Sequence, residues 1–463
     1  MTKPKHAILL CAVLIGAALL VIRVMSDSFV RGTNTFDHPF IVFFACLSGA
    51  GLIWLAFIPL IKRLKESGKS LTKLVWIIVF VGLVFRAIFF GSTTIYEDDW
   101  KRYLWDGYVV TQGDNPYKAS PQQILIVDPE KPNIYAEYQA VSHENDNFLH
   151  QINNPHLTTI YPPVAQAVFG LAAYIAPFNL DALRFLFLLS EIAALALLIK
   201  ALTLYGRSPL WSALYALNPL VIYSGFNVVH MDVLLVPFIF LAMICIKRFP
   251  FRSAVALSFA AAVKLWPLLL APIFYASWRN RPLIFIGSAL LVSILTLGFF
   301  WPMLAELNDG SGLKAYSGSW QRSSFLYRII QSGLSALVED PSLVARLLIA
   351  AIVSGVSIYW GLWAKVDDDL LPRRLLFVTA LLFFLSPTGY PWYGIWLIIF
   401  LPFLPSYGIA MLSVTLPLYY LRFALGEREI YHIYTDILVP IQFGIPLLII
   451  GFELWRERRY AKQ

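Results

Sequence analysis

The stretch MTKPKHAILLCAVLIGAALLVIRV, residues 1–24, begins with basic residues and continues as an apolar run about as long as one membrane-spanning helix. A cleaved signal peptide would follow its apolar region with a small-residue cleavage site. Here the apolar region is followed by Arg23, Val24 and Met25 instead. The stretch therefore predicts an uncleaved first transmembrane helix whose N-terminus lies inside the cell.

Similar apolar runs recur along the whole chain of 463 residues, which is 59% hydrophobic and only 14% charged. A soluble domain is about 25% charged. Three cysteines lie inside apolar runs and suggest neither a disulfide framework nor a metal cluster. We expect a single all-α, polytopic membrane domain over 1–463, with about 12 transmembrane helices. The candidate spans are 7–24, 39–61, 74–91, 160–177, 182–205, 208–225, 231–246, 253–275, 282–302, 342–363, 373–387, 391–404, 407–424 and 436–455.

The orientation of these spans is predicted by Lys and Arg in short loops, which favour the cytoplasmic side. Such basic segments are 62–73, 247–252, 277–281, 372–374 and the tail after Trp455. They place both termini in the cytoplasm. They also account for the net charge of +8, so that charge does not require a role in nucleic-acid binding. Residues 92–159 then form a long external loop with ten Asp or Glu but four Lys or Arg. A second external loop covers 303–324, and 388–391 and 425–435 also lie outside.

Two regions do not fit a simple count of crossings. Four apolar segments lie between the first external loop and the cytoplasmic segment 247–252, where an odd number of crossings is required. One of these segments therefore does not span. The run 253–275 joins two cytoplasmic segments and contains Pro267 and Pro272, which interrupt a helix. We expect a re-entrant pair bent near Lys264 to Pro267, which is stable only where protein or water covers the broken backbone.

Charged residues concentrate in YEDDWKRYLWDGYVVTQGDNPY, residues 96–117. If 97–107 is helical, one face carries Asp99, Arg102, Tyr103 and Asp106. An ionised carboxylate here could accept the proton of an attacking sugar hydroxyl. Arg102 would keep that carboxylate ionised, or it would bind a phosphate with its planar guanidinium. The alternative is a solvated surface helix whose charges pair with one another.

Two other stretches have both a structural and a functional interpretation. Tyr161 precedes two prolines that open an apolar helix, and proline suits a first helical turn. His230 and Asp232 interrupt an apolar run two residues apart, and they either form local contacts or bind a metal, although no third ligand is evident.

A cation and a group of aromatic residues also stand out. Lys264 lies in the middle of an apolar run, where a charged residue usually faces a cavity or a partner. It either extends to the membrane interface or binds an anion such as a lipid phosphate. Trp392, Tyr393 and Trp396 follow a short external turn. They form an interfacial aromatic belt, or they stack on a sugar.

Five phrases together resemble a known family: YEDDWKRYLWDGYVVTQGDNPY, INNPHLTTIYPPVAQ, NPLVI followed by HMD, KLWP, and SPTGYPWYGIWL. They are similar to bacterial membrane glycosyltransferases of the GT-C fold, and within these to the mannosyltransferase-like group that uses polyprenyl-phosphate sugars. The resemblance extends over most of the chain. It implies a multi-helix bundle with the active site at its outer face and an essential acid in the first long external loop.

The resemblance also implies a chemistry. A hexose, with mannose favoured, passes from a polyprenyl-phosphate donor to an acceptor hydroxyl with inversion, and neither a metal nor another cofactor is needed. Asp99 best matches the essential acid of the family, and Asp98 comes second. The run Glu97-Asp98-Asp99 departs from the family pattern and leaves the choice of base open. The implied substrate-binding residues are Arg102, Asp106, Tyr161, His230, Asp232, Lys264, Arg322, Trp392 and Tyr393.

We therefore expect a hexosyltransferase of the bacterial plasma membrane whose partners are the lipid-linked donor, a lipid-linked glycan or other envelope acceptor, and membrane lipids. A competing class is a polytopic transporter or flippase of lipid-linked glycans. Such proteins often show internal repeats and charges at mid-membrane in both halves. Here the acidic residues concentrate in one external loop, and repeats are not visible. A polymerase or ligase for preassembled glycans would need more cations in the external loops than the four in 92–159.

Overall fold

The computed structural model describes residues 2–29, 38–65, 71–126 and 133–460. Within these ranges the chain is helical and contains no β-strand, only two isolated bridges. The prediction of an all-α protein is therefore confirmed. Residues 66–70 of the basic segment and 127–132 of the first external loop lie outside the described residues.

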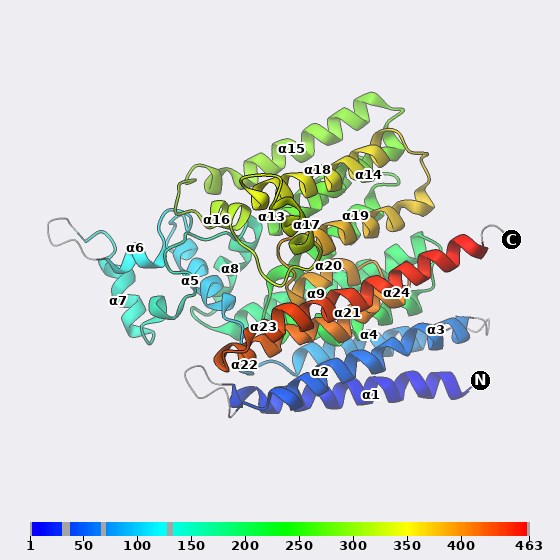
Figure 1. Cartoon of the computed structure of the whole chain (residues 1–463), viewed down its shortest axis with the longest axis horizontal. Helices are drawn as coiled ribbons and strands as arrows, with labels where there is room; N and C mark the ends of the chain where they lie inside the picture. Colours follow the sequence, from blue (N-terminus) through cyan, green and yellow to red (C-terminus); the bar gives the residue numbers. More distant parts are fainter. Residues whose placement is uncertain (1, 30–37, 66–70, 127–132, 461–463) are drawn as a thin grey trace.

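The bundle is built from long apolar helices that lie side by side (Figure 1). Seven helices within the described ranges are long and apolar enough to cross a membrane, and an eighth is possible if one bent pair counts as a span. The predicted count of about 12 crossings is therefore not confirmed. The seven spans are Pro4–Ser28, Phe40–Leu64, Leu180–Leu204, Pro282–Leu304, Pro341–Leu362, Tyr407–Gly426 and Tyr431–Arg459.

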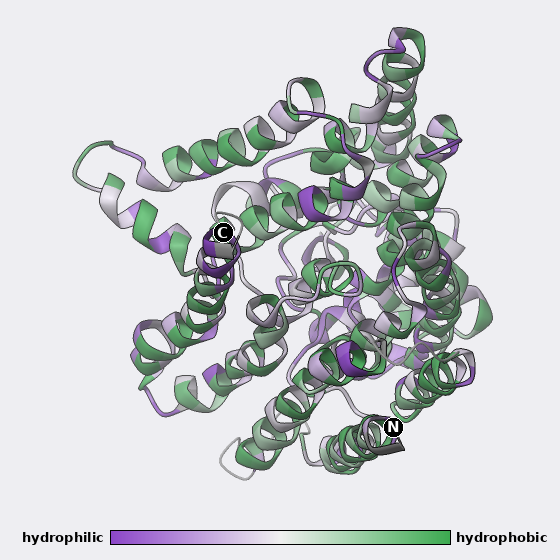
Figure 2. Ribbon diagram, turned by 90° about the vertical axis from the view of Figure 1, so that its right-hand side faces the viewer, coloured by the Kyte–Doolittle hydropathy of each residue, from purple (hydrophilic) through white to green (hydrophobic). Residues whose placement is uncertain are grey.

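Many of these helices expose apolar side chains, as a membrane protein does. In α1 (Thr2–Met25), Ile15 and Leu19 are fully buried, whereas Val13 and Val24 are about two-thirds exposed. A helix that is hydrophobic on all sides must be buried in protein or in lipid. Figure 2 shows hydrophobic residues along most of the helices. The exposed apolar surface therefore indicates a membrane protein.

The two ends of the bundle differ. Figure 1 shows both termini at one end, and α6 (Pro121–Leu125) and α7 (Ala136–Glu144) at the other. The helices α5 (Asp99–Thr111) and α8 (Pro163–Ile175) lie next to them. Gly107 allows α5 to pack directly against α8, because a Cβ at this position would overlap the carbonyl of Phe169. The helix considered over 97–107 is present from Asp99 onward and extends to Thr111, whereas Glu97 and Asp98 precede it.

Both regions that resisted a simple count contain broken helices. Residues Pro219–Asn227 and Met231–Cys245 form two helical segments bent by 110°, so the apolar runs 208–225 and 231–246 are not two straight spans. The helix α13 (Pro250–Val263) ends just before Lys264, and a short turn over Trp266–Leu270 and α14 (Ala271–Tyr275) follow. The predicted break near Lys264 is therefore present.

A buried ion pair joins two helices inside the bundle. Arg86 of α4 (Thr72–Ala87) and Glu191 of α9 (Leu180–Leu204) are fully buried, and their side chains lie 2.7 Å apart. Arg86 also donates to the carbonyls of Gly82 and Ala216 at 2.9 and 2.7 Å, and the Tyr215 hydroxyl donates to Glu191 at 2.5 Å. These bonds offset the cost of removing two charges from water. The pair links α4 to α9 inside the bundle.

The remaining helices complete the bundle. Their bounds are α2 (Phe40–Leu55), α3 (Phe57–Lys65), α10 (Ala213–Ala216), α11 (Pro219–Ile222), α12 (Val236–Cys245), α15 (Pro282–Leu304), α16 (Gly312–Gly318), α17 (Leu326–Leu334), α18 (Pro341–Leu362), α19 (Leu371–Leu385), α20 (Ile395–Ile398), α21 (Tyr407–Thr415), α22 (Leu421–Glu427), α23 (Tyr431–Ile433) and α24 (Val439–Tyr460).

Candidate active site

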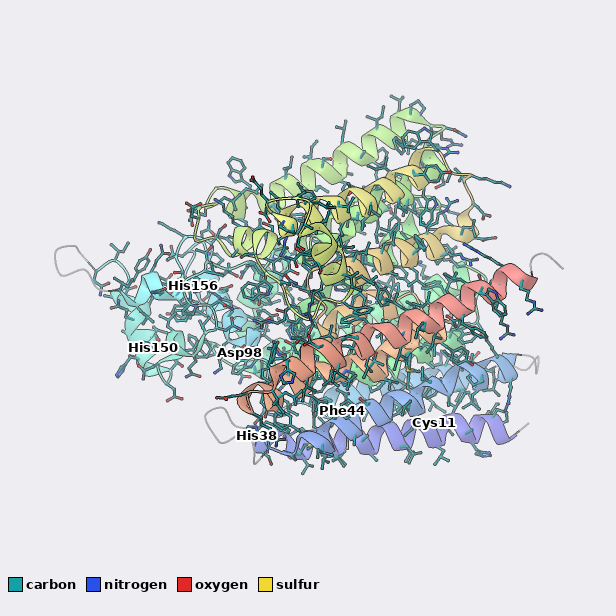
Figure 3. The ribbon with its side chains drawn as sticks, in the orientation of Figure 1. Cys11, His38, Phe44, Asp98, His150 and His156 are labelled. Atoms are coloured by element: carbon teal, nitrogen blue, oxygen red, sulfur yellow. The ribbon has the colours of Figure 1, made fainter. Side chains whose placement is uncertain are left out.

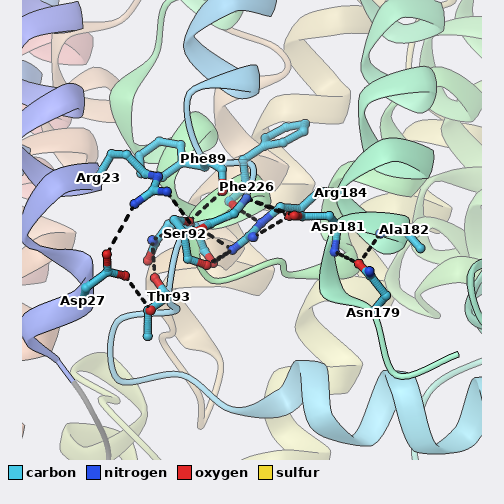
Figure 4. A network of polar contacts seen from close by, with 12 residues as sticks. Arg23, Asp27, Phe89, Ser92, Thr93, Asn179, Asp181, Ala182, Arg184 and Phe226 are labelled. Carbon is cyan, nitrogen blue, oxygen red and sulfur yellow. Dashed lines mark hydrogen bonds and ion pairs between the residues drawn. The ribbon is translucent and has the colours of Figure 1, made fainter. Parts of the chain in front are cut away.

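The segment that leads into α5 is fixed by a polar network (Figure 4). The buried guanidinium of Arg184 donates to the Ser92 carbonyl and to the Phe226 carbonyl, both at 2.8 Å. The Asn227 side chain accepts from the Ile95 amide at 3.1 Å. These bonds tie the segment before Asp99 to α9 and to the turn at Tyr223–Asn227. The backbone just before the three acidic residues is therefore held in place.

The bend between Asn227 and Met231 places two polar side chains at the end of a broken helix. Val229 has a φ of +55° there, an unusual conformation for a β-branched residue that the surrounding packing must stabilise. His230 follows it, and its amide donates to the Ser224 carbonyl at 2.9 Å. His230 and Asp232 are each only 1% exposed. The bend therefore holds an imidazole and a carboxylate inside the protein.

The three consecutive acids have different surroundings. Glu97 is buried and interacts electrostatically with a separate group: Tyr223, Tyr419, Tyr420 and Arg422. Asp98 and Asp99 instead share the side-chain amide of Asn153, which donates to them at 2.7 and 3.1 Å. Figure 3 shows Asp98 beside the bundle, with His150 and His156 farther out on the loop. Glu97 is thus directed away from the other two acids.

Asp99 has contacts that a catalytic base would need. One of its carboxylate oxygens lies 3.9 Å from Nδ1 of His230, and the Tyr161 hydroxyl donates to the carboxylate. Burial and the neighbouring Asp98 charge raise the pKa of Asp99. The hydrogen bonds from Asn153 and Tyr161 and the Lys264 charge oppose that rise. A carboxylate with a raised pKa is a stronger proton acceptor than an ordinary aspartate.

An ion pair lies within electrostatic reach of Asp99. The Lys264 ammonium lies 3.0 and 3.1 Å from the two carboxylate oxygens of Asp232. The indole N–H of Trp396 also donates to Asp232, at 2.7 Å. The ammonium lies 4.4 Å from the ring centre of Tyr393, close enough for a cation–π interaction. The structure thus provides Lys264 with an anionic partner inside the protein.

Residues 386–396 form an aromatic segment whose rings lie against the imidazole of His230 and the ammonium of Lys264. The Trp392 ring is stacked with His230 at 3.6 Å and with Tyr390 at 4.4 Å, so two parallel neighbours occupy its faces. Tyr393 is stacked with Trp396 at 4.2 Å. Trp392 and Tyr393 were expected to shape a sugar site. That role stays a prediction, and in this structure their rings lie against the imidazole of His230 and the ammonium of Lys264.

Arg102 and Asp106 lie in a different group. Asp106 is 1% exposed and accepts from the Gln166 amide at 2.9 Å, while Arg102 donates to the Leu157 carbonyl at 2.5 Å. Burial raises the pKa of Asp106 to about 6, although the charge of Arg102 and the bonds from Gln166 and Thr159 oppose it. The residues predicted to share one face of α5 therefore lie in two separate groups. Arg102 interacts with Leu157 and Asp106 rather than with Asp99.

Arg322 is joined to the aromatic segment through its backbone. Its amide donates to the Pro387 carbonyl, and its carbonyl accepts from the Gly389 amide, both at 2.9 Å. The exposed side chain has an electrostatic interaction with Tyr390. A role in donor binding stays a prediction.

Sequence reasoning missed two residues of this site. Asn153 holds Asp98 and Asp99, and Tyr316 bonds the Tyr393 hydroxyl at 2.9 Å. Asn153 lies in the phrase INNPHL, but one of two adjacent asparagines gives no signal of its own. Tyr316 is one of 23 tyrosines, so its position alone did not mark it.

The comparisons with known proteins give one match. Residues 5–280 match the model of the MptA_B family, described as alpha-(1->6)-mannopyranosyltransferase, N-terminal domain. The match covers more than half of the 463 residues and includes Asp99, His230 and Lys264. No curated protein and no solved structure matches the chain. The family name indicates a mannosyltransferase, in agreement with the resemblance seen in the sequence.

Proposed function

The chain belongs to the alpha-(1->6)-mannopyranosyltransferase family, and we propose that it transfers mannose from a polyprenyl-phosphate donor to an acceptor hydroxyl at the outer face of the bacterial plasma membrane. In this proposal the fold is of the GT-C type, both termini are cytoplasmic and the acceptor is a lipid-linked or other envelope glycan. The observation that carries it is the Asp99 carboxylate, which lies 3.9 Å from His230 and within reach of the Lys264 charge.

Asp99 acts as the general base of a single displacement. Its carboxylate takes the proton of the acceptor hydroxyl while the hydroxyl oxygen bonds to the anomeric carbon. The bond between that carbon and the donor phosphate breaks, and the phosphate leaves with the bonding electrons on its lipid. Attack from the face opposite the leaving group inverts the anomeric carbon. The raised pKa of Asp99 favours the proton transfer.

Lys264 stabilises the leaving phosphate. An ammonium has three N–H donors, and the two Asp232 oxygens account for two short contacts. The Lys264 side chain remains 20% exposed, so its third donor has room for a phosphate oxygen. Asp232 and the Tyr393 ring fix the direction of the ammonium, and Trp392 fixes the imidazole of His230.

The flippase alternative has one observation in its favour. Transporters also form their substrate sites at broken helices, and the bend of 110° before Met231 is a break of this kind. A flippase, however, moves its lipid without breaking a bond. A chemical product therefore distinguishes the two functions.

Reconstitution in liposomes tests the proposal directly. The purified protein receives radiolabelled polyprenyl-phosphate mannose, glucose or arabinose together with an extracted envelope glycan. We expect label in the glycan from the mannose donor, with a new α-(1→6) linkage, and a rate of labelling about 10²–10⁴ lower with the Asp99→Asn variant. Movement of the labelled lipid across the bilayer without any glycoside formed would support the flippase instead.

A further inference from the structure

The imidazole of His230 has an environment that the base mechanism does not explain. It is 1% exposed, and its Nε2 has no hydrogen-bond partner among the residues that the structure describes. Its ring is held by the parallel Trp392 ring at 3.6 Å. Because no group among the described residues accepts a hydrogen bond from Nε2, the proton of the neutral imidazole is assigned to Nδ1, which lies on the Asp99 side. The ring is fixed, and its Nδ1 points toward the carboxylate of Asp99.

The distance between these two groups would allow both to bind one hydroxyl oxygen. Nδ1 of His230 and the carboxylate oxygen of Asp99 are 3.9 Å apart, which is too far for a direct hydrogen bond. An oxygen about 2.8 Å from both atoms would see them at an angle of about 90°. That angle is acceptable for a hydroxyl oxygen that donates its proton to one atom and accepts one from the other. The gap therefore matches one hydroxyl group.

We infer that His230 and Asp99 together bind the acceptor hydroxyl, with His230 as the residue that orients its oxygen. This inference rests on the proposed function and deepens it. Neutral His230 carries its proton on Nδ1 and donates it to a lone pair of the hydroxyl oxygen. The hydroxyl proton is donated to Asp99 and passes to it during attack. The second lone pair of the oxygen forms the bond to the anomeric carbon, and the donor phosphate leaves. His230 keeps its proton throughout, so it is not the base.

Two amide variants separate this role from simple packing. The side-chain amide of asparagine reaches the place of Nδ1, whereas that of glutamine reaches the place of Nε2. Both variants lose the ring stacked on Trp392 and keep an amide, and they differ by one methylene and in which ring nitrogen the amide replaces. His230→Phe keeps a ring but loses both nitrogens. An exposed histidine of the loop, His156, provides the control variant His156→Gln.

The measurement is steady-state transfer from polyprenyl-phosphate mannose in liposomes, with donor and acceptor varied separately. His230→Asn should keep about three- to tenfold more of the acceptor kcat/KM than His230→Gln, the usual worth of one hydrogen bond. His230→Phe should resemble the glutamine variant, and the donor KM should stay the same in all of them. His156→Gln should match the unmodified protein.

Equal losses in the asparagine and glutamine variants would overturn the inference, as would a phenylalanine variant with normal acceptor kcat/KM. If neither amide variant folds, the phenylalanine variant decides alone. Failure of the proposed function looks different, because the unmodified protein would then form no glycoside from the mannose donor at all.

Discussion

Replacing Lys264 by methionine should destabilise the protein by about 3 kcal/mol, because it leaves a buried carboxylate without its cation. Asp232 is 1% exposed, and after the change its carboxylate keeps the hydrogen bond from the Trp396 indole at 2.7 Å but loses the ammonium. Removing one partner of a buried ion pair costs about 3–5 kcal/mol. The lower end applies here because the Lys264 side chain is 20% exposed.

A double-mutant cycle measures this coupling. Asp232→Asn leaves Lys264 without its counter-charge, and the Lys264→Met, Asp232→Asn double variant removes both charges. The double variant should be more stable than the sum of the two losses predicts, by at least about 1 kcal/mol. The assay is the free energy of unfolding in mixed micelles, followed by tryptophan fluorescence during titration with a denaturing detergent. Lys247→Met is the control, since Lys247 lies over the Tyr205 ring at 4.5 Å, and it should cost less than about 1 kcal/mol.

Donor affinity separates the structural role of Lys264 from its proposed role in phosphate binding. It should fall in Lys264→Met and stay low in the double variant, because removing Asp232 restores the charge balance but supplies no phosphate ligand. Strictly additive stability losses would refute the ion pair. A normal donor affinity in Lys264→Met would show that the ammonium serves Asp232 alone.

Three further predictions concern other parts of the molecule. Turnover should fall on acidification at a higher pH than the titration of an ordinary aspartate would give, because the pKa of Asp99 is raised. Asn153→Ala should move this fall to still higher pH, because it removes a hydrogen bond that favours the charged carboxylate. Stability should decrease as the pH rises from about 4 to about 6, because burial raises the pKa of Asp106 to about 6 and only the unfolded chain releases this proton there. Asp106→Asn should make that decrease smaller, and the raised pKa of Asp99 accounts for a part that remains. In a cysteine-free background, a cysteine replacing the exposed Gln112 should react with an impermeant maleimide from outside, and one replacing the exposed Arg63 only after the membrane is opened.

The helical class and the break near Lys264 were predictable because both depend on local properties of the chain. Long apolar runs form helices in a membrane, and Pro267 cannot continue one. The bend before His230 was harder to predict, since it depends on Val229 adopting a positive φ that the sequence does not favour. The predicted count of about 12 crossings is not confirmed, and the bent pair shows that two apolar runs can belong to one broken span.

Individual residues of the candidate site could be identified from the sequence, but which of them lie next to each other could not. Asp99 and His230 were identified in separate phrases, and nothing in a single sequence indicates that residues 131 positions apart face each other. The helical spacing predicted that Arg102 would accompany Asp99. Tertiary packing instead gives Arg102 the Leu157 carbonyl and gives Lys264 the Asp232 carboxylate.

Turnover of the Asp99→Asn variant with polyprenyl-phosphate mannose tests the central claim most directly. Asparagine keeps the size of the side chain but cannot accept a proton, so turnover should fall by about 10²–10⁴, with unchanged donor binding. Glu97→Gln should have the smallest effect among the three acids, because Glu97 lies in the separate group around Tyr419. An Asp99→Asn variant with nearly normal turnover would contradict the account, and an inactive Asp98→Asn variant beside it would move the base by one residue.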